Sequence, residues 1–243
     1  MGEKRWVTAA AGDGFVVALA SDSTLWSWGR NFYGQLGDST QEERHQPQQI
    51  AADRKWVAIS AGRDHAVALA ADSTLWGWGN NTHRQLGDGT DIDRSIPTQI
   101  GTEEKWIALS AGHYSSAALA ADRTFWGWGT DDGQFGRGNS GLLTTPHQIS
   151  SEMEWSSLAI AHRHGIVIDS GGALWSSGVN YYGQLGDGTK DGRYTFEVIG
   201  GGRSWLMASV GNISSCAIAS DRTLWRWGDG ETLPQLVKKS QTI

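Results

Sequence analysis

The chain has 243 residues, of which 39% are hydrophobic and 19% charged, and its formal net charge is −6. This composition excludes a disordered chain, and no apolar run approaches the roughly 20 residues of a membrane-spanning helix. The negative charge argues against a surface for nucleic-acid phosphates, and a single cysteine, Cys216, excludes an internal disulfide framework. The first residues lack the apolar core of a signal peptide. We expect a soluble protein. The sequence leaves its cellular compartment open and slightly favours the cytoplasm.

The 14 tryptophans form a lattice along the chain. They stand at positions 6, 26, 28; 56, 76, 78; 106, 126, 128; 155, 175; and 205, 225, 227. The first member of each set recurs every 49 or 50 residues, and the second follows it by 20. A period of this length signals tandem structural repeats. We predict repeats at about 6–55, 56–105, 106–154, 155–204 and 205–238, all within a single domain that covers residues 1–243.

The second repeat shows the expected elements in chain order. A strand pattern starts at Trp56 with WVAIS, and a second starts at His65 with HAVALA. Turn residues at Asp72-Ser73 precede TLWGWG, and the repeat closes with PTQI, whose proline suits a strand start or edge. Four short strands per repeat describe one blade of a β-propeller. We predict an all-β propeller of five blades with four short antiparallel strands each, and little helix.

Two motifs recur with this lattice. Leu-Trp-x-Trp-Gly occupies 25–29, 75–79 and 224–228, with Phe125 in place of Leu in the third repeat, and an Asn-x-Tyr-Gly-Gln-Leu-Gly run occupies 31–37 and 180–186. The element Ala-Gly-x-x-His is complete only at 61–65. The pattern resembles the regulator of chromosome condensation repeat family over essentially the whole chain. The resemblance implies the propeller fold and leaves function open, because the family includes exchange factors, ubiquitin-ligase modules, a plant ultraviolet photoreceptor and secreted inhibitors.

The number of repeats departs from that family, whose best-known members form seven-bladed rings. Five blades can close a ring, remain an open arc or assemble with another chain. We favour closure in which the N-terminal strands, within 6–20, pair with the C-terminal strands, within 223–237, because an open arc exposes a sheet edge and an apolar face. The fifth repeat lacks the Gly-Gln-Leu-Gly-Asp-Gly loop, which indicates either degeneration of a terminal repeat or a notch where a partner docks.

The lattice tryptophans are predicted to pack between blades, since each buries roughly 150–250 Å². The structural set is Trp26, Trp76, Trp126, Trp175 and Trp225. The glycines that follow (29, 79, 129, 178 and 228) are expected to permit close backbone approach or unusual φ values. His65 occupies the family's usual histidine position, which implies a structural hydrogen bond.

Function is expected where the repeats differ, and the turn that follows each Ala-Gly differs in every repeat. In a ring, these turns lie at the same height and converge on one face. The candidate binding residues are Asp13, Phe15, Arg63, Asp64, His113, Tyr114, His162, Arg163, His164 and Asn212. A second variable surface lies in the loops at 30–33, 82–84, 131–132 and 181–182, whose aromatic residues serve either an interface or packing between blades.

Catalysis has little support, because the chain has no Gly-x-Ser-x-Gly elbow and no phosphate-binding P-loop. Cys216 lies in a strand-like run and is read as a small buried hydrophobe, and the aspartates at 22, 72, 122 and 221 are read as turn stabilisers. We considered zinc at His162 and His164 with His113 and Asp64, and calcium at 88–93, which lacks the distal Glu of a calcium loop. We predict no metal, no cofactor and no enzymatic activity.

The favoured hypothesis is a non-catalytic protein-interaction propeller that presents its variable turns to a protein partner. One alternative is a guanine nucleotide exchange factor-like regulator of a small GTPase, although no repeat carries an inserted wedge. Another is a carbohydrate-binding propeller. Ultraviolet sensing is disfavoured because the variable turns contain no tryptophan. Nucleic acid and membrane partners are not expected, and the composition suggests a bacterial or otherwise reducing origin.

Overall fold

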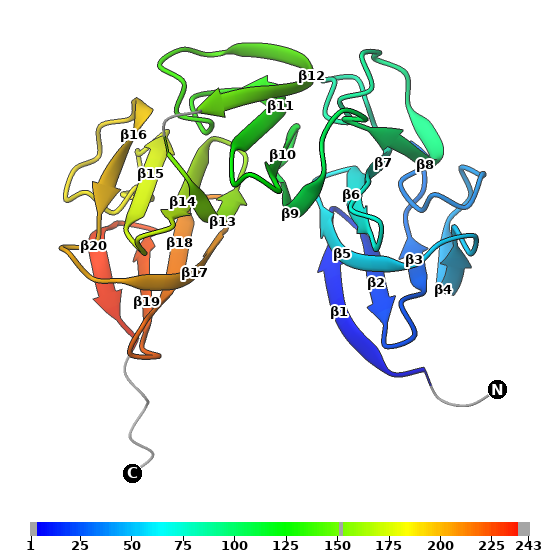
Figure 1. Cartoon of the computed structure of the whole chain (residues 1–243), viewed down its shortest axis with the longest axis horizontal. Helices are drawn as coiled ribbons and strands as arrows, with labels where there is room; N and C mark the ends of the chain where they lie inside the picture. The colour runs from blue at the N-terminus through cyan, green and yellow to red at the C-terminus, as the bar shows by residue number, and fades with distance from the viewer. Residues whose placement is uncertain (1–3, 151–152, 238–243) are drawn as a thin grey trace. The chain divides into compact units, whose positions relative to one another are not determined.

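The computed structural model describes residues 4–150 and 153–237. Within these residues all regular secondary structure is β: twenty strands form five separate four-stranded antiparallel sheets (Figure 1). The sequence prediction of an all-β chain with five sheets of four strands is confirmed. No helix long and apolar enough to cross a bilayer occurs in this part of the chain.

Each sheet is made by one repeat, and its strands lie side by side in chain order. The first sheet contains β1 (Trp6–Ala11), β2 (Phe15–Ala20), β3 (Leu25–Gly29) and β4 (Arg44–Ile50). The second contains β5 (Trp56–Ala61), β6 (His65–Ala70), β7 (Leu75–Gly79) and β8 (Arg94–Ile100). The third contains β9 (Trp106–Ala111), β10 (Ser115–Ala120), β11 (Phe125–Asp131) and β12 (Gly141–Ser150). The fourth contains β13 (Trp155–Ile160), β14 (His164–Asp169), β15 (Leu174–Gly178) and β16 (Arg193–Ile199). The fifth contains β17 (Trp205–Val210), β18 (Ser214–Ala219), β19 (Leu224–Gly228) and β20 (Glu231–Leu236).

The repeat boundaries follow the tryptophan lattice, since the first Trp of each set opens the first strand of its sheet. The predicted end of the fifth repeat, residue 238, lies outside the described residues. The fourth strand of the second sheet begins at Arg94, three residues before the predicted Pro97. All four prolines lie in these outer strands, where a missing N–H need not remove a ladder bond.

The expected pairing of N-terminal with C-terminal strands is not found. Among the described residues, β1 pairs with β2 and β20 pairs with β19, so both are edge strands of sheets built from a single repeat. Each repeat already supplies four strands, and no sheet is left short of a strand that the other end of the chain must complete. In the fifth repeat the long loop is replaced by the two-residue turn Asp229-Gly230, with φ of 54° and 103°.

The sheets group into two compact units. The first unit contains the first three sheets, and the second contains the fourth and fifth sheets together with residues 132–140, the loop between β11 and β12. Within the first unit the core lies between sheet faces: Val17, Leu19 and Leu25 of the first sheet are buried in one cluster with Trp56 and Trp78 of the second. The second unit repeats this arrangement, with Ile166 and Ile168 against Trp205 and Trp227.

The lattice tryptophans hold each sheet together at one end. In every sheet the first Trp packs edge-on against the second, with ring centroids 5.8–6.2 Å apart. In four sheets the second Trp donates its indole N–H to a threonine hydroxyl, and that hydroxyl donates to the recurrent aspartate at 22, 72, 122 or 221. In the fourth sheet Trp175 donates to Asp169 directly. The recurrent aspartates therefore stabilise turns.

Candidate functional site

The variable turns connect the first two strands of each sheet, at residues 12–14, 62–64, 112–114, 161–163 and 211–213; we call them the hairpin turns. Each is closed by the same backbone bond, from the N–H of its first residue to the carbonyl of the residue that opens the next strand, at 2.8–2.9 Å. A glycine of the third strand, its last residue in every sheet except the third, pairs opposite that opening residue, and its φ is positive in all five sheets, between 83° and 114°. A Cβ at Gly79 would clash with backbone of Asp64 and His65, so glycine is required there.

The opening residue of the second strand points inward, which corrects two predicted site residues. Phe15 is 1% exposed and lies in the core cluster between the first and second sheets. His164 is 0% exposed, as is His65 at the equivalent position. Neither Phe15 nor His164 forms part of a binding surface, because β2 and β14 start one residue earlier than a three-residue turn at 13–15 or 162–164 requires.

The two buried histidines, His65 and His164, lie in equivalent environments in different sheets. His65 Nε2 lies 2.9 Å from the Ser116 hydroxyl of the next sheet, and that hydroxyl lies 2.8 Å from the Gln85 carbonyl. Since the carbonyl only accepts, Ser116 donates its one hydrogen to it and His65 donates from Nε2. Burial, with the charge of His113, lowers the pKa of His65 to about 3, so the ring is neutral. His164 makes the same contact with Ser215, whose hydroxyl donates to Gln184.

In the first unit, exposed and half-buried side chains from three hairpin turns contact one another. Arg63 Nε lies 3.8 Å from the Asp13 carboxylate and 3.5 Å from that of Asp64. Its guanidinium donates to the Tyr114 hydroxyl and lies over the Tyr114 ring, 5.7 Å from the centroid. The backbones of the same two turns are also joined, since the Asp13 N–H donates to the Arg63 carbonyl at 2.8 Å. The predicted convergence of the turns on one surface therefore holds for these three sheets.

Residues of the second variable surface extend this cluster. The Arg30 guanidinium lies 3.6 Å from the Asp13 carboxylate, and the ring of His83 packs against Tyr114 at 4.3 Å between centroids. The sequence analysis treats the variable turns and the loops after the third strands as two surfaces. In the first unit they form one continuous surface, because the chain that leaves the third strand bonds to the hairpin turn, as the Arg30 N–H does to the Gly14 carbonyl. We call Asp13, Arg30, Arg63, Asp64, His83, His113 and Tyr114 the turn surface. Burial, together with Arg63, lowers the pKa of His113.

The second unit has its own, smaller group of turn residues. Arg163 is exposed and its Nε lies 3.4 Å from the Asp132 carboxylate. Asn212 is exposed and His162 is half-buried. Asp132 comes from the loop between β11 and β12, which belongs to this unit.

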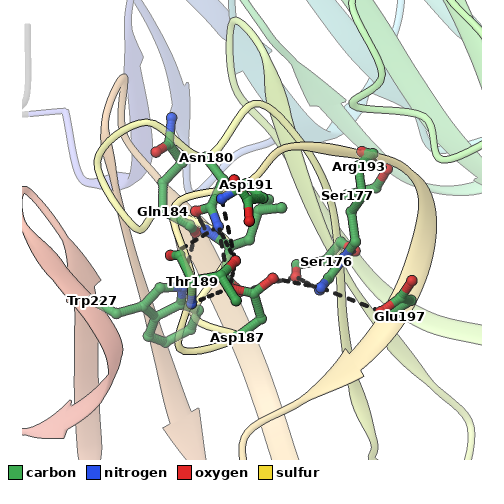
Figure 2. Close-up of polar contacts among 11 residues, drawn as sticks. Ser176, Ser177, Asn180, Gln184, Asp187, Thr189, Asp191, Arg193, Glu197 and Trp227 are labelled. Carbon is green, nitrogen blue, oxygen red and sulfur yellow. Dashed lines mark hydrogen bonds and ion pairs between the residues drawn. The ribbon is translucent and has the colours of Figure 1, made fainter.

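The long loop after the third strand braces the following sheet. In the fourth repeat, Asn180 donates to the Asp187 carboxylate and the Thr189 carbonyl, while its own oxygen accepts from the Leu185 N–H (Figure 2). The Gln184 carbonyl then accepts the indole N–H of Trp227 in the next sheet at 2.9 Å. We call 31–40, 81–90 and 180–189 the bracing loops, because the same contacts join Gln35 to Trp78 and Gln85 to Trp128.

The aspartate of each bracing loop is fully engaged within the loop. Asp88 accepts from Asn81 and Thr90, and its carboxylate lies 2.6 Å from the Arg94 guanidinium. Burial alone would raise the pKa of Asp88, but the hydrogen bonds from Thr90 and Arg94 outweigh it and lower that pKa below its usual value. The segment 88–93 is thus built as a turn. The described residues contain no cluster of three or more possible metal ligands.

Two of the three bracing loops carry exposed aromatic residues at their tips. Phe32 is 67% exposed and Tyr181 is 71% exposed. The sequence analysis offers two roles for these aromatics, an interface or packing between blades, and their exposure does not fit packing between blades.

Two further residues singled out in the sequence are partly or fully buried. Ser177, which stands where other repeats have Trp, is buried and donates to the Gly133 carbonyl at 2.7 Å. Cys216 is half-buried, and burial raises the pKa of its thiol.

Comparison with known families identifies repeats in the N-terminal part of the chain. Residues 22–69 and 72–119 match the model of the regulator of chromosome condensation (RCC1) repeat, and a second RCC1 repeat model matches 6–35 and 56–85. A search of curated proteins found no match.

Solved structures share the fold at low identity. The human WBSCR16 structure superposes with a TM-score of 0.87 at 20% identity, covering 98% of this chain and 68% of that one. Yeast RCC1 (Prp20), solved with Kap60 bound, gives 0.64 at 17%, covering 98% and 76%. The ectodomain of the Physcomitrella patens receptor kinase CR4 gives 0.62 at 21%, covering 94% and 53%. The family models show RCC1 repeats over residues 6–69 and 72–119, and the shared fold supports an RCC1-type repeat β-propeller for the chain.

Proposed function

We propose that this chain is a non-catalytic protein-interaction module and that its turn surface contacts a protein partner. The observation that carries the proposal is the contact of Asp13, Arg63 and Tyr114, which come from three different sheets. A surface assembled from separate repeats is rigid, because each turn is fixed by its own hairpin. Arginine and tyrosine are the residues most enriched at interaction hot spots.

The chemistry of the surface also favours binding over catalysis. Its carboxylates lie against arginines, and one of its two histidines, His113, has its pKa lowered by burial and by Arg63. An unpaired nucleophile beside a general base, which catalysis requires, does not stand out in this cluster. A structural relative supports a protein partner: Prp20p of Saccharomyces cerevisiae, which matches at a TM-score of 0.65 and 18% identity, was solved in a study of its binding to Gsp1p and histones.

The test compares two pairs of surface substitutions. Arg63→Ala with Tyr114→Ala removes the centre of the turn surface. Arg123→Asn with Arg222→Asn is the matched control, since these exposed arginines lie at the opposite hairpin ends and Asn tolerates their positive φ of 66° and 67°. Affinity capture from the source organism, quantified by mass spectrometry, is expected to lose its main protein with the first pair and keep it with the second. Equal capture by both pairs contradicts the placement of the site.

The second candidate function, an exchange factor-like regulator of a small GTPase, draws on the same Prp20p relationship. It predicts that the chain accelerates release of a fluorescent guanine nucleotide from at least one member of a GTPase panel. Release at the uncatalysed rate across the panel removes this candidate and leaves the interaction module. The carbohydrate-binding alternative gains no support, because the first and third tryptophans of most repeats are buried in the core.

A further inference from the structure

A repeated contact lies at the ends of the sheets remote from the hairpin turns. The residue two positions before the first Trp of each repeat is Lys4, Arg54, Glu104, Met153 or Arg203. In three sheets this residue is a cation that lies over the second Trp. Arg54 Cζ is 3.8 Å from the Trp76 centroid, Arg203 Cζ is 4.2 Å from that of Trp225, and Lys4 Nζ is 5.0 Å from that of Trp26. These distances lie within the roughly 6 Å range of cation–π attraction.

The third sheet has the aromatic half of this contact and lacks the cation. Glu104 replaces the arginine, and among the described residues no cation lies over Trp126. A cavity of about 570 Å³ opens there, lined by Trp106, Trp126, Glu103, Glu104, Thr145 and Pro146 among others. The equivalent cavity of the second sheet, about 400 Å³, is lined by Trp76 and by Arg54 itself.

The carboxylate half of the contact is present too. In the second sheet Asp53 pairs with Arg54 at 2.6 Å, so one guanidinium bridges a carboxylate and an indole ring. Glu103 occupies the position of Asp53 in the third repeat. Within the described part of the chain neither Glu103 nor Glu104 has an ion-pair partner, whereas Asp88, also in the cavity wall, is neutralised by Arg94 at 2.6 Å.

We propose that the cavity beside Trp126, the Trp126 pocket, binds an arginine side chain supplied by a partner protein. The guanidinium lies over Trp126 and pairs with Glu103 and Glu104, as Arg54 does with Trp76 and Asp53 inside the chain. Arginine fits better than lysine because its planar fork stacks on an aromatic face while binding a carboxylate. The net negative charge of the wall favours a cation over an anion.

The Trp126 pocket is a second contact region, separate from the turn surface. Trp106 opens β9 and the hairpin turn 112–114 follows the end of that strand. Six residues at about 3.3 Å each place the two regions roughly 20 Å apart. The inference rests on the proposed function only for the source of the arginine, since a protein partner would present it.

The test uses a short peptide, so it needs no natural partner. Acetyl-Gly-Arg-Gly-amide is titrated into 15N-labelled protein, with the citrulline peptide as the uncharged isostere. The Trp126 indole N–H signal is identified by its loss in Trp126→Phe. We expect this signal to shift progressively with the arginine peptide and to stay still with the citrulline peptide. A Trp126 signal that does not move, or that moves equally with both peptides, overturns the proposal.

Two substitutions exchange the properties of the second and third sheets. Glu104→Arg places the missing cation in the chain, so it is expected to weaken peptide binding at least about tenfold, with the remaining indole signals unchanged. Glu104→Gln is its matched control, which removes the charge and leaves the pocket open, and it should weaken binding less. Arg54→Glu is expected to make the Trp76 signal respond to the peptide. Full binding by Glu104→Arg contradicts the placement of the pocket.

The outcome is separable from that of the proposed function. Loss of partner capture on changing the turn surface, with no peptide response at Trp126, supports the interaction module and rejects the pocket. A peptide response at Trp126, with capture unaffected by the turn substitutions, supports the pocket and rejects the turn surface as the site.

Discussion

The bracing loops and the turn surface lie close together in the first two repeats, and their residues differ in recurrence and in bonding partners. In the bracing loops the residues recur: Asn81 and Asp88 of the second repeat hold the loop together with Arg94, and buried Gln85 joins the loop to Trp128 of the next sheet. On the turn surface the residues differ in every repeat, are largely exposed and bond mainly to one another. The comparison teaches that this chain separates residues that recur to maintain the fold from residues that vary between repeats.

The largest expected effect comes from removing a braced tryptophan. Trp128 is buried and its indole N–H donates to the Gln85 carbonyl, so Trp128→Ala should reduce the free energy of unfolding by about 3–5 kcal/mol. Trp28 is the equivalent residue of the first sheet; it is only partly buried, and among the described residues no loop carbonyl accepts its indole N–H. Trp28→Ala should cost clearly less. Urea unfolding followed by circular dichroism measures both, and equal losses would show that bracing contributes little.

The next effect isolates the loop itself. Asn81 donates to Asp88 and to two backbone carbonyls and accepts from the Leu86 N–H, all while buried. Asn81→Ala leaves these groups unsatisfied and should cost about 2–3 kcal/mol. Thr82→Ala, an exposed neighbour in the same loop, is the control and should change stability by less than about 0.5 kcal/mol. The same urea titration decides, and an Asn81→Ala variant as stable as Thr82→Ala would contradict the network.

A third prediction concerns pH. The pKa of His65 falls to about 3 in the folded chain, below its ordinary value of 6.5. The unfolded chain therefore binds this proton first, so stability holds above pH 6.5 and declines as the pH falls from there towards 3. The contact between the first and second sheets has no titratable group at this place. Phe15 and Ala66 stand there at the positions that His65 and Ser116 occupy between the second and third sheets.

The double variant His65→Phe with Ser116→Ala copies that apolar solution. We expect it to fold and to show a smaller drop in melting temperature between pH 7 and pH 4.5 than the native chain does. His164 retains its own lowered pKa, about 4, so some dependence on pH remains. Parallel curves for the double variant and the native chain would mean that His65 does not cause the decline.

The smallest expected effect on stability belongs to the turn surface. Arg63 and Asp13 form an exposed ion pair, with side chains 43% and 55% exposed, and such pairs contribute little in water. Arg63→Ala with Tyr114→Ala should change the melting temperature by no more than a few degrees. A loss of stability as large as that caused by Asn81→Ala would contradict the distinction between the two regions, because the turn surface would then also maintain the fold.

Much of the fold followed from the sequence because the tryptophan lattice fixes the repeat and its strand order. Trp56 and its equivalents marked each first strand correctly, since a large aromatic at a sheet interface leaves a regular signature. The sequence predicts that the fourth strand of the second repeat starts at Pro97, because the preceding Arg94-Ser-Ile shows no strand-like alternation. In the structure this strand starts at Arg94, which pairs with Gly79 of β7.

The residues of the candidate site were harder to predict from the sequence than the strands. The candidate turns were found from their variation, but Phe15 and His164 were placed one position too far outward, because side-chain direction depends on where each strand begins. The union of Arg30 and His83 with the hairpin turns required the pairing of the third strand. The cation beside the second Trp was missed, although its spacing from the first Trp repeats, because a mixture of Lys, Arg, Glu and Met shows no shared chemistry until distances are known.

The bracing loops give the chain a direction. Gln35 secures Trp78 and Gln85 secures Trp128, and in the other unit Gln184 secures Trp227, so in each case an earlier repeat completes a later one. During synthesis the completing loop emerges from the ribosome before the sheet that depends on it. Each such sheet therefore meets a bracing loop that has already been synthesised. Truncation from the C-terminal side, in contrast, exposes the apolar face of the last remaining sheet, as removal of Trp56 and Trp78 would expose Val17, Leu19 and Leu25.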